Sequence, residues 1–233
     1  MSSKEQKIVI AAKCAPEEAI LGRIGEAGLE AVELYTNTAY LSRLDHMKHI
    51  GSGFPFRYAV HAPNDGGAWH PLVDAVNMVQ AEIVVFHNVY WENEWELILR
   101  AFEDTPAKLC MENTSSVLDV VKFMRRFGIG MCLDMEHLQI ECAGYFDEGA
   151  RPFLGMASHV HMTGYTFGSS LWHTHLHRSA EHNFRLLNEI GQAGFSGMVV
   201  SEAQVSLQTL PEFKALRNFA EEWYEKMGHP YEK

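Results

Sequence analysis

Short apolar runs alternate along the chain with longer amphipathic segments. The runs have the length and the β-branched content of buried strands. They cover residues 7–12, 31–35, 57–61, 82–87, 108–112, 130–134, 159–162 and 197–201.

The segments between these runs carry helical spacing and helix signals. Pro16 opens the first helix with acids in its first turn, and Gly25 and Gly28 end it. A further helix is predicted through 40–44, and Gly51-Ser52-Gly53 is expected to break the chain after it. Other helices are predicted at 71–79, 91–103, 115–127, 184–193 and 210–227. We expect 138–158 to be partly irregular and 165–180 to be a long loop. Eight strand–helix units in one chain predict a single (β/α)₈ TIM barrel over residues 1–233.

Size and composition fit one soluble domain. The chain has 233 residues, of which 47% are hydrophobic, enough for one large core. The sequence contains no stretch of 18 apolar residues, so we expect no membrane-spanning helix. Residues 1–7 lack an apolar signal core. The four cysteines have no CxxC spacing and fit buried thiols in a reducing compartment. We therefore expect a cytoplasmic protein with no membrane partner.

Charge narrows the choice of partner. The net charge of −11 disfavours nucleic acid, since a polyanion requires a basic patch. Thirteen histidines are an unusual number for this length. We expect a small-molecule substrate and leave open whether the chain forms a homo-oligomer.

Acids and histidines stand where the predicted strands end. Glu112 ends the run at 108–112, Asp134 ends the run at 130–134, and Glu202 follows the last run. His161 lies in the seventh run, and His61 and His87 end two earlier ones. Parallel strands of a barrel end at one rim, so these side chains are expected to form one site.

Carboxylates and imidazoles together suit borderline divalent ions such as Mn²⁺, Zn²⁺ or Co²⁺. The lack of a thiolate in the set disfavours a structural zinc site. Converging acids would repel one another without a cation. We expect Glu112, Asp134, His161 and Glu202 to be the ligands. His159 shares a strand face with His161 and is expected lower in the barrel, hydrogen-bonded.

Other interpretations of these residues stay open. Glu112 could belong to the N-terminal turn of a helix. His137, at the start of the loop after Asp134, could bind metal or face the substrate. The segment 172–178 alternates His173, His175 and His177. It could hold a further ion, contact the substrate or form a polar surface loop.

The strand-end motifs resemble the xylose isomerase-like TIM-barrel superfamily. This superfamily includes ketose epimerases, inosose dehydratases, hydroxypyruvate isomerase and endonuclease IV (AP endonuclease family 2). The matching segments are 60–63 (VHAP), 85–87 (VFH), 109–113 (LCMEN), 132–137 (CLDMEH), 159–161 (HVH) and 200–202 (VSE).

The ketose epimerase branch supplies the leading hypothesis. The resemblance implies one divalent ion held by Glu112, Asp134, His161 and Glu202. It also implies that Glu112 and Glu202 exchange the proton next to the substrate carbonyl, through an enediolate. The expected activity is a metal-dependent isomerase or epimerase acting on a sugar or a small polyhydroxylated carbonyl compound. Expected substrate contacts are His61, His87, His137, Trp172, His175 and Arg178.

Endonuclease IV supplies an alternative, a multinuclear-zinc phosphodiesterase. His61, His87 and His137 match positions of its larger ligand set, and His173 stands where that enzyme has an acid. The acidic net charge counts against this alternative. A metal-dependent dehydratase of the same barrel is a further alternative.

The chain departs from the family patterns at three places. Met162-Thr163-Gly164 follows His161 where relatives often carry an acid. An arginine that holds substrate oxygens is not evident, and Arg178 is the substitute we consider. Thr114 stands where xylose isomerase uses a lysine, which disfavours isomerisation in that manner.

Overall fold

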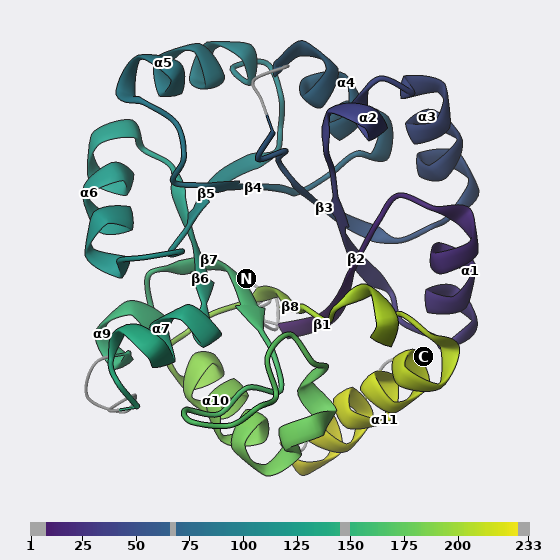
Figure 1. The fold of residues 1–233 in the computed structure, drawn as a ribbon, viewed down its shortest axis with the longest axis vertical. Helices are drawn as coiled ribbons and strands as arrows, with labels where there is room; N and C mark the ends of the chain where they lie inside the picture. Colours follow the sequence, from purple (N-terminus) through teal and green to yellow (C-terminus); the bar gives the residue numbers. More distant parts are fainter. Residues whose placement is uncertain (1–7, 66–68, 145–149, 228–233) are drawn as a thin grey trace, which may run out of the picture.

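In the computed structural model, eight parallel strands close into one barrel in sequence order (Figure 1). The structure describes residues 8–65, 69–144 and 150–227. The strands are β1 (Ile8–Cys14), β2 (Ala31–Tyr35), β3 (Arg57–His61), β4 (Ile83–His87), β5 (Lys108–Glu112), β6 (Gly130–Asp134), β7 (Ala157–Met162) and β8 (Gly197–Ser201). The predicted (β/α)₈ architecture is confirmed, and β2, β3, β5, β6 and β8 have the predicted bounds.

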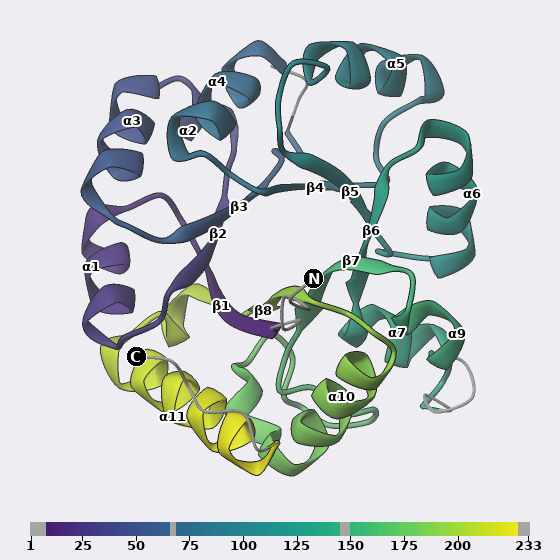
Figure 2. The same cartoon turned by 180° about the vertical axis from the view of Figure 1, so that it is seen from behind.

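Helices form a ring outside the strands (Figures 1 and 2). They are α1 (Glu18–Glu26), α2 (Thr38–Leu41), α3 (Leu44–Gly53), α4 (Trp69–Val79), α5 (Glu92–Ala101), α6 (Val117–Phe127), α7 (Met135–Glu141), α9 (Arg151–Leu154), α10 (Ala180–Gln192) and α11 (Leu210–Lys226), with short 3₁₀ helices η1 (Leu176–Ser179) and η2 (Val205–Leu207). Among the described residues, no helix combines the length and apolar character needed to cross a membrane. Because α7 starts directly after β6, His137 lies in a helix and not in the predicted loop.

Alternation along the strands separates two apolar layers. Large side chains fill the space between the sheet and the helices, in one continuous cluster. Smaller clusters lie apart from it and line the inside of the barrel: Val9, Ala11, Ala31, Ala59, Met198 and Val200 on one side, Val85, Cys110 and Cys132 on the other. Successive residues of a strand face opposite sides, so the next inward position is two residues further on.

That next inward position is polar in every strand. The residues are Lys13, Glu33, His61, His87, Glu112, Asp134, His161 and Glu202. We call these eight residues the rim cluster. The apolar layers beneath them fill the barrel, so the polar layer lies at the carboxyl end, where barrel enzymes bind their substrates.

Gly51 has a packing role that the sequence did not suggest. The predicted break at Gly51-Ser52-Gly53 is wrong, because all three residues belong to α3, whose C-cap is Phe54. A β-carbon built on Gly51 would lie 2.3 Å from the carbonyl oxygen of Met78 in α4. The glycine therefore allows α3 to approach the backbone of α4 more closely than any other residue would.

Gly51→Ala should destabilise the barrel by about 1–3 kcal/mol, because backbone atoms of two helices must move apart. Urea unfolding measures the difference. Gly22→Ala is the matched control, since a β-carbon there meets nothing within 4 Å. That variant should gain about 0.5–1 kcal/mol from helix propensity. Equal effects of the two substitutions would contradict the packing role.

Candidate functional site

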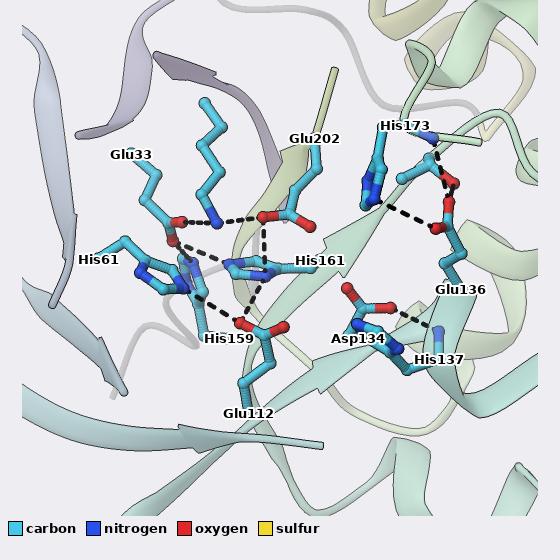
Figure 3. A network of polar contacts seen from close by, with 12 residues as sticks. Glu33, His61, Glu112, Asp134, Glu136, His137, His159, His161, His173 and Glu202 are labelled. Atoms are coloured by element: carbon cyan, nitrogen blue, oxygen red, sulfur yellow. Dashed lines mark hydrogen bonds and ion pairs between the residues drawn. The ribbon is translucent and has the colours of Figure 1, made fainter. Parts of the chain in front are cut away.

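His161 lies at the centre of the rim cluster. Its Nε2 donates a hydrogen bond of 2.9 Å to Oε2 of Glu33. Its Nδ1 lies 3.3 Å from Oε2 of Glu112 and 3.3 Å from Oε1 of Glu202, without a hydrogen-bond partner. Figure 3 shows the three carboxylates turned toward this one ring. A buried ring nitrogen that faces two carboxylates requires a cation, either a proton or a metal ion.

The charges around His161 agree with that requirement. Burial alone would lower the pKa of His161, but Cys132, Glu202 and Glu33 raise it well above its ordinary value. The negative surroundings that favour a proton on Nδ1 also favour a metal ion there, because both are cations. The two compete for this nitrogen, since a metal ligand must give up its proton.

The carboxylates crowd one another. Burial, and then the charges of Glu202 and Glu112, raise the pKa of Asp134 well above its ordinary value. Burial alone would raise the pKa of Glu112 as well, but His161, His61 and His87 hold it well below the usual range. Glu112 and Asp134 are both 2% exposed, so solvent screens this repulsion little. A divalent ion between the acids would relieve it.

Asp134 is fixed by its neighbours on both sides. The side chain of Asn113 accepts a hydrogen bond from the backbone N–H of Asp134 (2.7 Å) and donates one to its carbonyl oxygen (3.0 Å). One carboxylate oxygen of Asp134 accepts a hydrogen bond of 2.8 Å from the backbone N–H of His137 and so caps α7. Asp134 therefore serves the helix as an N-cap while its carboxylate stays beside the cluster.

His61, His87 and Glu112 form a second group at the rim. His61 donates from Nδ1 to the carbonyl oxygen of Ala62 (3.0 Å), so its Nε2 carries a lone pair. That Nε2 lies 3.1 Å from Nε2 of His87 and 3.3 Å from Glu112, and His87 also lies 3.3 Å from Glu112. The group has the composition of a second cation site that shares Glu112.

Sequence reasoning missed Lys13 and Glu33. Glu33 is fully buried and also accepts a hydrogen bond of 2.8 Å from His159, which lies below His161 as predicted. Lys13 forms an ion pair with Glu202 and lies 3.1 Å from Oε1 of Glu33. Burial alone would raise the pKa of Glu33, but His161 and Lys13 hold it well below the usual range. The available signal was a single charged residue inside each of two apolar strands.

Glu136 is a further buried acid that the sequence analysis did not single out. It accepts hydrogen bonds from the hydroxyl of Thr163 (2.6 Å) and from the backbone N–H of His173 (3.3 Å). His173 has a left-handed backbone with φ of 44°. Glu136 thus holds the loop after β7 beside the site, and Figure 3 shows the ring of His173 on the Glu136 side.

His175 and Arg178, which we predicted as substrate contacts, have other partners in this structure. His175 is fully buried and lies 2.9 Å from the hydroxyl of Ser201 through Nδ1 and 3.2 Å from the carbonyl oxygen of Leu207 through Nε2. Both ring nitrogens are therefore engaged in the loop packing. Arg178 forms an ion pair with Glu212 of α11, and His177 lies 3.1 Å from the same carboxylate. Trp172 remains half-exposed and stacks on Tyr165 with ring centroids 4.2 Å apart.

Four groups within the described residues could hold a metal ion, each with ligand atoms within 4.8 Å of one another. They are Cys132–His159–His161, His61–His87–Glu112, Glu33–His161–Glu202 and Glu112–Asp134–His137. Each of the four groups includes at least one of the four predicted ligands, Glu112, Asp134, His161 and Glu202. Within the described part of the chain, His173 and His175 belong to none of these groups.

No protein-family model matches the chain, and no curated protein matches it significantly. Solved structures match over nearly the whole chain. L-ribulose 3-epimerase has a TM-score of 0.66 at 13% identity and covers 94% of this chain and 95% of its own. A xylose isomerase domain protein from Planctomyces limnophilus has 0.64 at 12%, covering 96% and 99%. D-allulose 3-epimerase from Methylomonas sp. in complex with D-allulose has 0.64 at 10%, covering 95% and 97%.

Phosphoribosylanthranilate isomerase from Thermotoga maritima also matches, with a TM-score of 0.56. At these identities the likeness establishes the fold, which this chain has in common with xylose isomerase-like sugar epimerases.

The buried position of His175 has a measurable effect on stability. Burial lowers the pKa of His175 from 6.5 to about 4. Between these two values the unfolded chain binds a proton at this residue and the folded chain does not. The free energy of unfolding should therefore fall by about 3 kcal/mol through His175 as the pH falls from 6.5 to 4.

His175→Gln should remove that part of the pH dependence, and His70→Asn, at an exposed histidine of α4, should retain it. Urea unfolding at pH 7 and pH 4.5 measures the difference. A wild-type slope in the His175→Gln variant would show that this ring titrates normally.

Proposed function

We propose that the barrel is a divalent-metal-dependent isomerase or epimerase acting on a sugar or a small polyhydroxylated carbonyl compound. One observation carries the proposal. Two carboxylates, Glu112 and Glu202, converge on the same ring nitrogen of His161, whose other nitrogen is held by Glu33. A site of this kind joins a cation position to two groups that can transfer protons.

The residues present fit a bound divalent ion. Glu112, Asp134, His161 and Glu202 would hold it, with Nδ1 of His161 as the nitrogen ligand. Glu33 would orient this imidazole from behind and increase its basicity, as carboxylates do behind metal-ligating histidines. The bound ion would polarise the substrate carbonyl and stabilise the negative charge that develops on its oxygen.

The proton transfer is assigned to Glu202 and Glu112. Glu202 would take the proton from the carbon next to the carbonyl, which leaves the electron pair in an enediolate. Glu112 would have to hold a proton from solvent before this step, and it would deliver that proton to the opposite face of the same carbon and so invert its configuration. Exchange with solvent would then remove the proton from Glu202 and return one to Glu112. Glu202 is the more accessible of the two, with 13% of its side chain exposed against 3% for Glu112.

The remaining rim residues would bind the substrate. His61, His87 and His137 lie beside Glu112 and Asp134. Trp172 offers an exposed aromatic face of the kind that packs on carbohydrate rings. The matched L-ribulose and D-allulose epimerases support a ketose or a related polyhydroxylated carbonyl compound as the substrate class.

Glu202→Gln should abolish exchange of substrate hydrogen with solvent, because it removes the proton acceptor and one charged ligand. The measurement is deuterium uptake from D₂O into D-allulose, L-ribulose and related ketoses by manganese-loaded protein. Glu82→Gln is the matched control, since Glu82 precedes β4 and pairs with Arg57 at the other end of the barrel. Uptake by the Glu202→Gln variant at the wild-type rate would refute the assigned role.

The group of His61, His87 and Glu112 favours a second candidate, a phosphodiesterase with two ions. Two ions that share a carboxylate can stabilise both the attacking and the leaving oxygen of a phosphodiester. The proposed isomerase should retain one ion per chain in elemental analysis and leave bis(p-nitrophenyl) phosphate intact. Two ions and hydrolysis of that compound, both lost in His87→Ala, would support the second candidate instead.

A further inference from the structure

Lys13 is the only lysine or arginine among the eight residues of the rim cluster. It comes from β1, two residues beyond the interior residue Ala11, so the strand directs it into the barrel. Its Nζ pairs with Oε1 of Glu202 and lies 3.1 Å from Oε1 of Glu33. Its side chain is 16% exposed. An ammonium held by two carboxylates at this depth is part of the site and not a surface ion pair.

The two carboxylates that hold Lys13 also belong to a candidate metal group. Glu33, His161 and Glu202 offer ligand atoms within 4.8 Å of one another. The ammonium already contacts one oxygen of each of the two acids. A divalent ion that used these same oxygens would have to displace the lysine.

The charges of the rim cluster also disfavour a second divalent ion. Four carboxylates (Glu33, Glu112, Asp134 and Glu202) crowd the rim, and Lys13 neutralises one of these negative charges. One divalent ion near Asp134 would neutralise two more. A second ion therefore gains less attraction while Lys13 is present, and Oε1 of Glu33 and Oε1 of Glu202 already contact the ammonium.

We propose that Lys13 replaces a divalent ion in this barrel, closing the position between Glu33 and Glu202 and keeping that part of the rim free of metal. Lys13 is thus a positioning residue that holds Glu202 and limits how many ions the site accepts. The inference rests on the proposed function only in taking the rim cluster as a cation site. A tethered ammonium has the advantage that chelators cannot remove it.

Lys13→Ala tests the proposal by removing the charge and opening space for an ion. The protein is stripped with a chelator, reloaded with excess Mn²⁺, desalted and analysed for manganese per chain. We expect one ion per chain more in Lys13→Ala than in the wild type. Lys13→Arg keeps the cation and should retain the wild-type count. Lys108→Ala removes an exposed strand lysine from the first residue of β5 and should also leave the count unchanged.

Equal counts in Lys13→Ala and the wild type would overturn the proposal. An extra ion in Lys108→Ala would overturn it as well, since net charge alone would then explain the gain. If Lys13→Ala fails to fold by circular dichroism, Lys13→Gln takes its place. It is also neutral, retains polar atoms beside the two acids, and carries the same expectation.

The wild-type count separates this proposal from the proposed function. One ion in both the wild type and Lys13→Ala would overturn the role of Lys13 and leave the isomerase proposal standing. No ion in the wild type and one in Lys13→Ala would support the role of Lys13 and overturn metal dependence. No ion in either protein would overturn both.

Discussion

The hydrogen bond from Nε2 of His161 to Glu33 is the interaction on which the site depends. It fixes which ring nitrogen carries the proton and leaves Nδ1 directed at Glu112 and Glu202. Glu33 is fully buried, and His161 and Lys13 hold its pKa well below the usual range, so that it accepts this bond as a carboxylate. Its charge is stabilised by two histidines and by Lys13, all within 3.1 Å. The imidazole of His161, its tautomer and its supporting acid therefore form one unit.

The interior of the barrel has room for this arrangement of polar side chains. Small residues such as Ala11, Ala31, Ala59 and Cys110 line the interior beneath the polar layer. The same alternation that directs them inward also directs Lys13, Glu33 and Glu112 inward two residues later. The strands that form the core thus also place the functional groups, and rigid strands hold such groups more accurately than loops do.

The histidine-rich segment after β7 shows how similar residues acquire different surroundings. His173 lies beside Glu136 at the edge of the site, His175 is buried among Ser201 and Leu207, and His177 faces Glu212 of the outer helix. The alternation of His173, His175 and His177 in the sequence would place all three on one side of an extended loop. The loop instead bends at His173 into a left-handed backbone, stays near the barrel through Glu136, and enters a 3₁₀ helix at Leu176. Only one of the three imidazoles therefore lies beside the site.

Period-2 apolar runs and polar strand ends are local patterns that any parallel barrel brings to one rim, so the fold class and the position of the candidate site could be predicted from the sequence. The sequence also singled out Glu112, Asp134, His161 and Glu202. The tertiary structure alone decided the partners of Glu33 and Lys13, since these residues meet across the barrel from strands far apart in sequence. It also decided the burial of His175 and the packing role of Gly51, because both depend on which distant backbone lies opposite. Local pattern fixes which face a residue takes, whereas a contact between distant segments exists only once the barrel has closed.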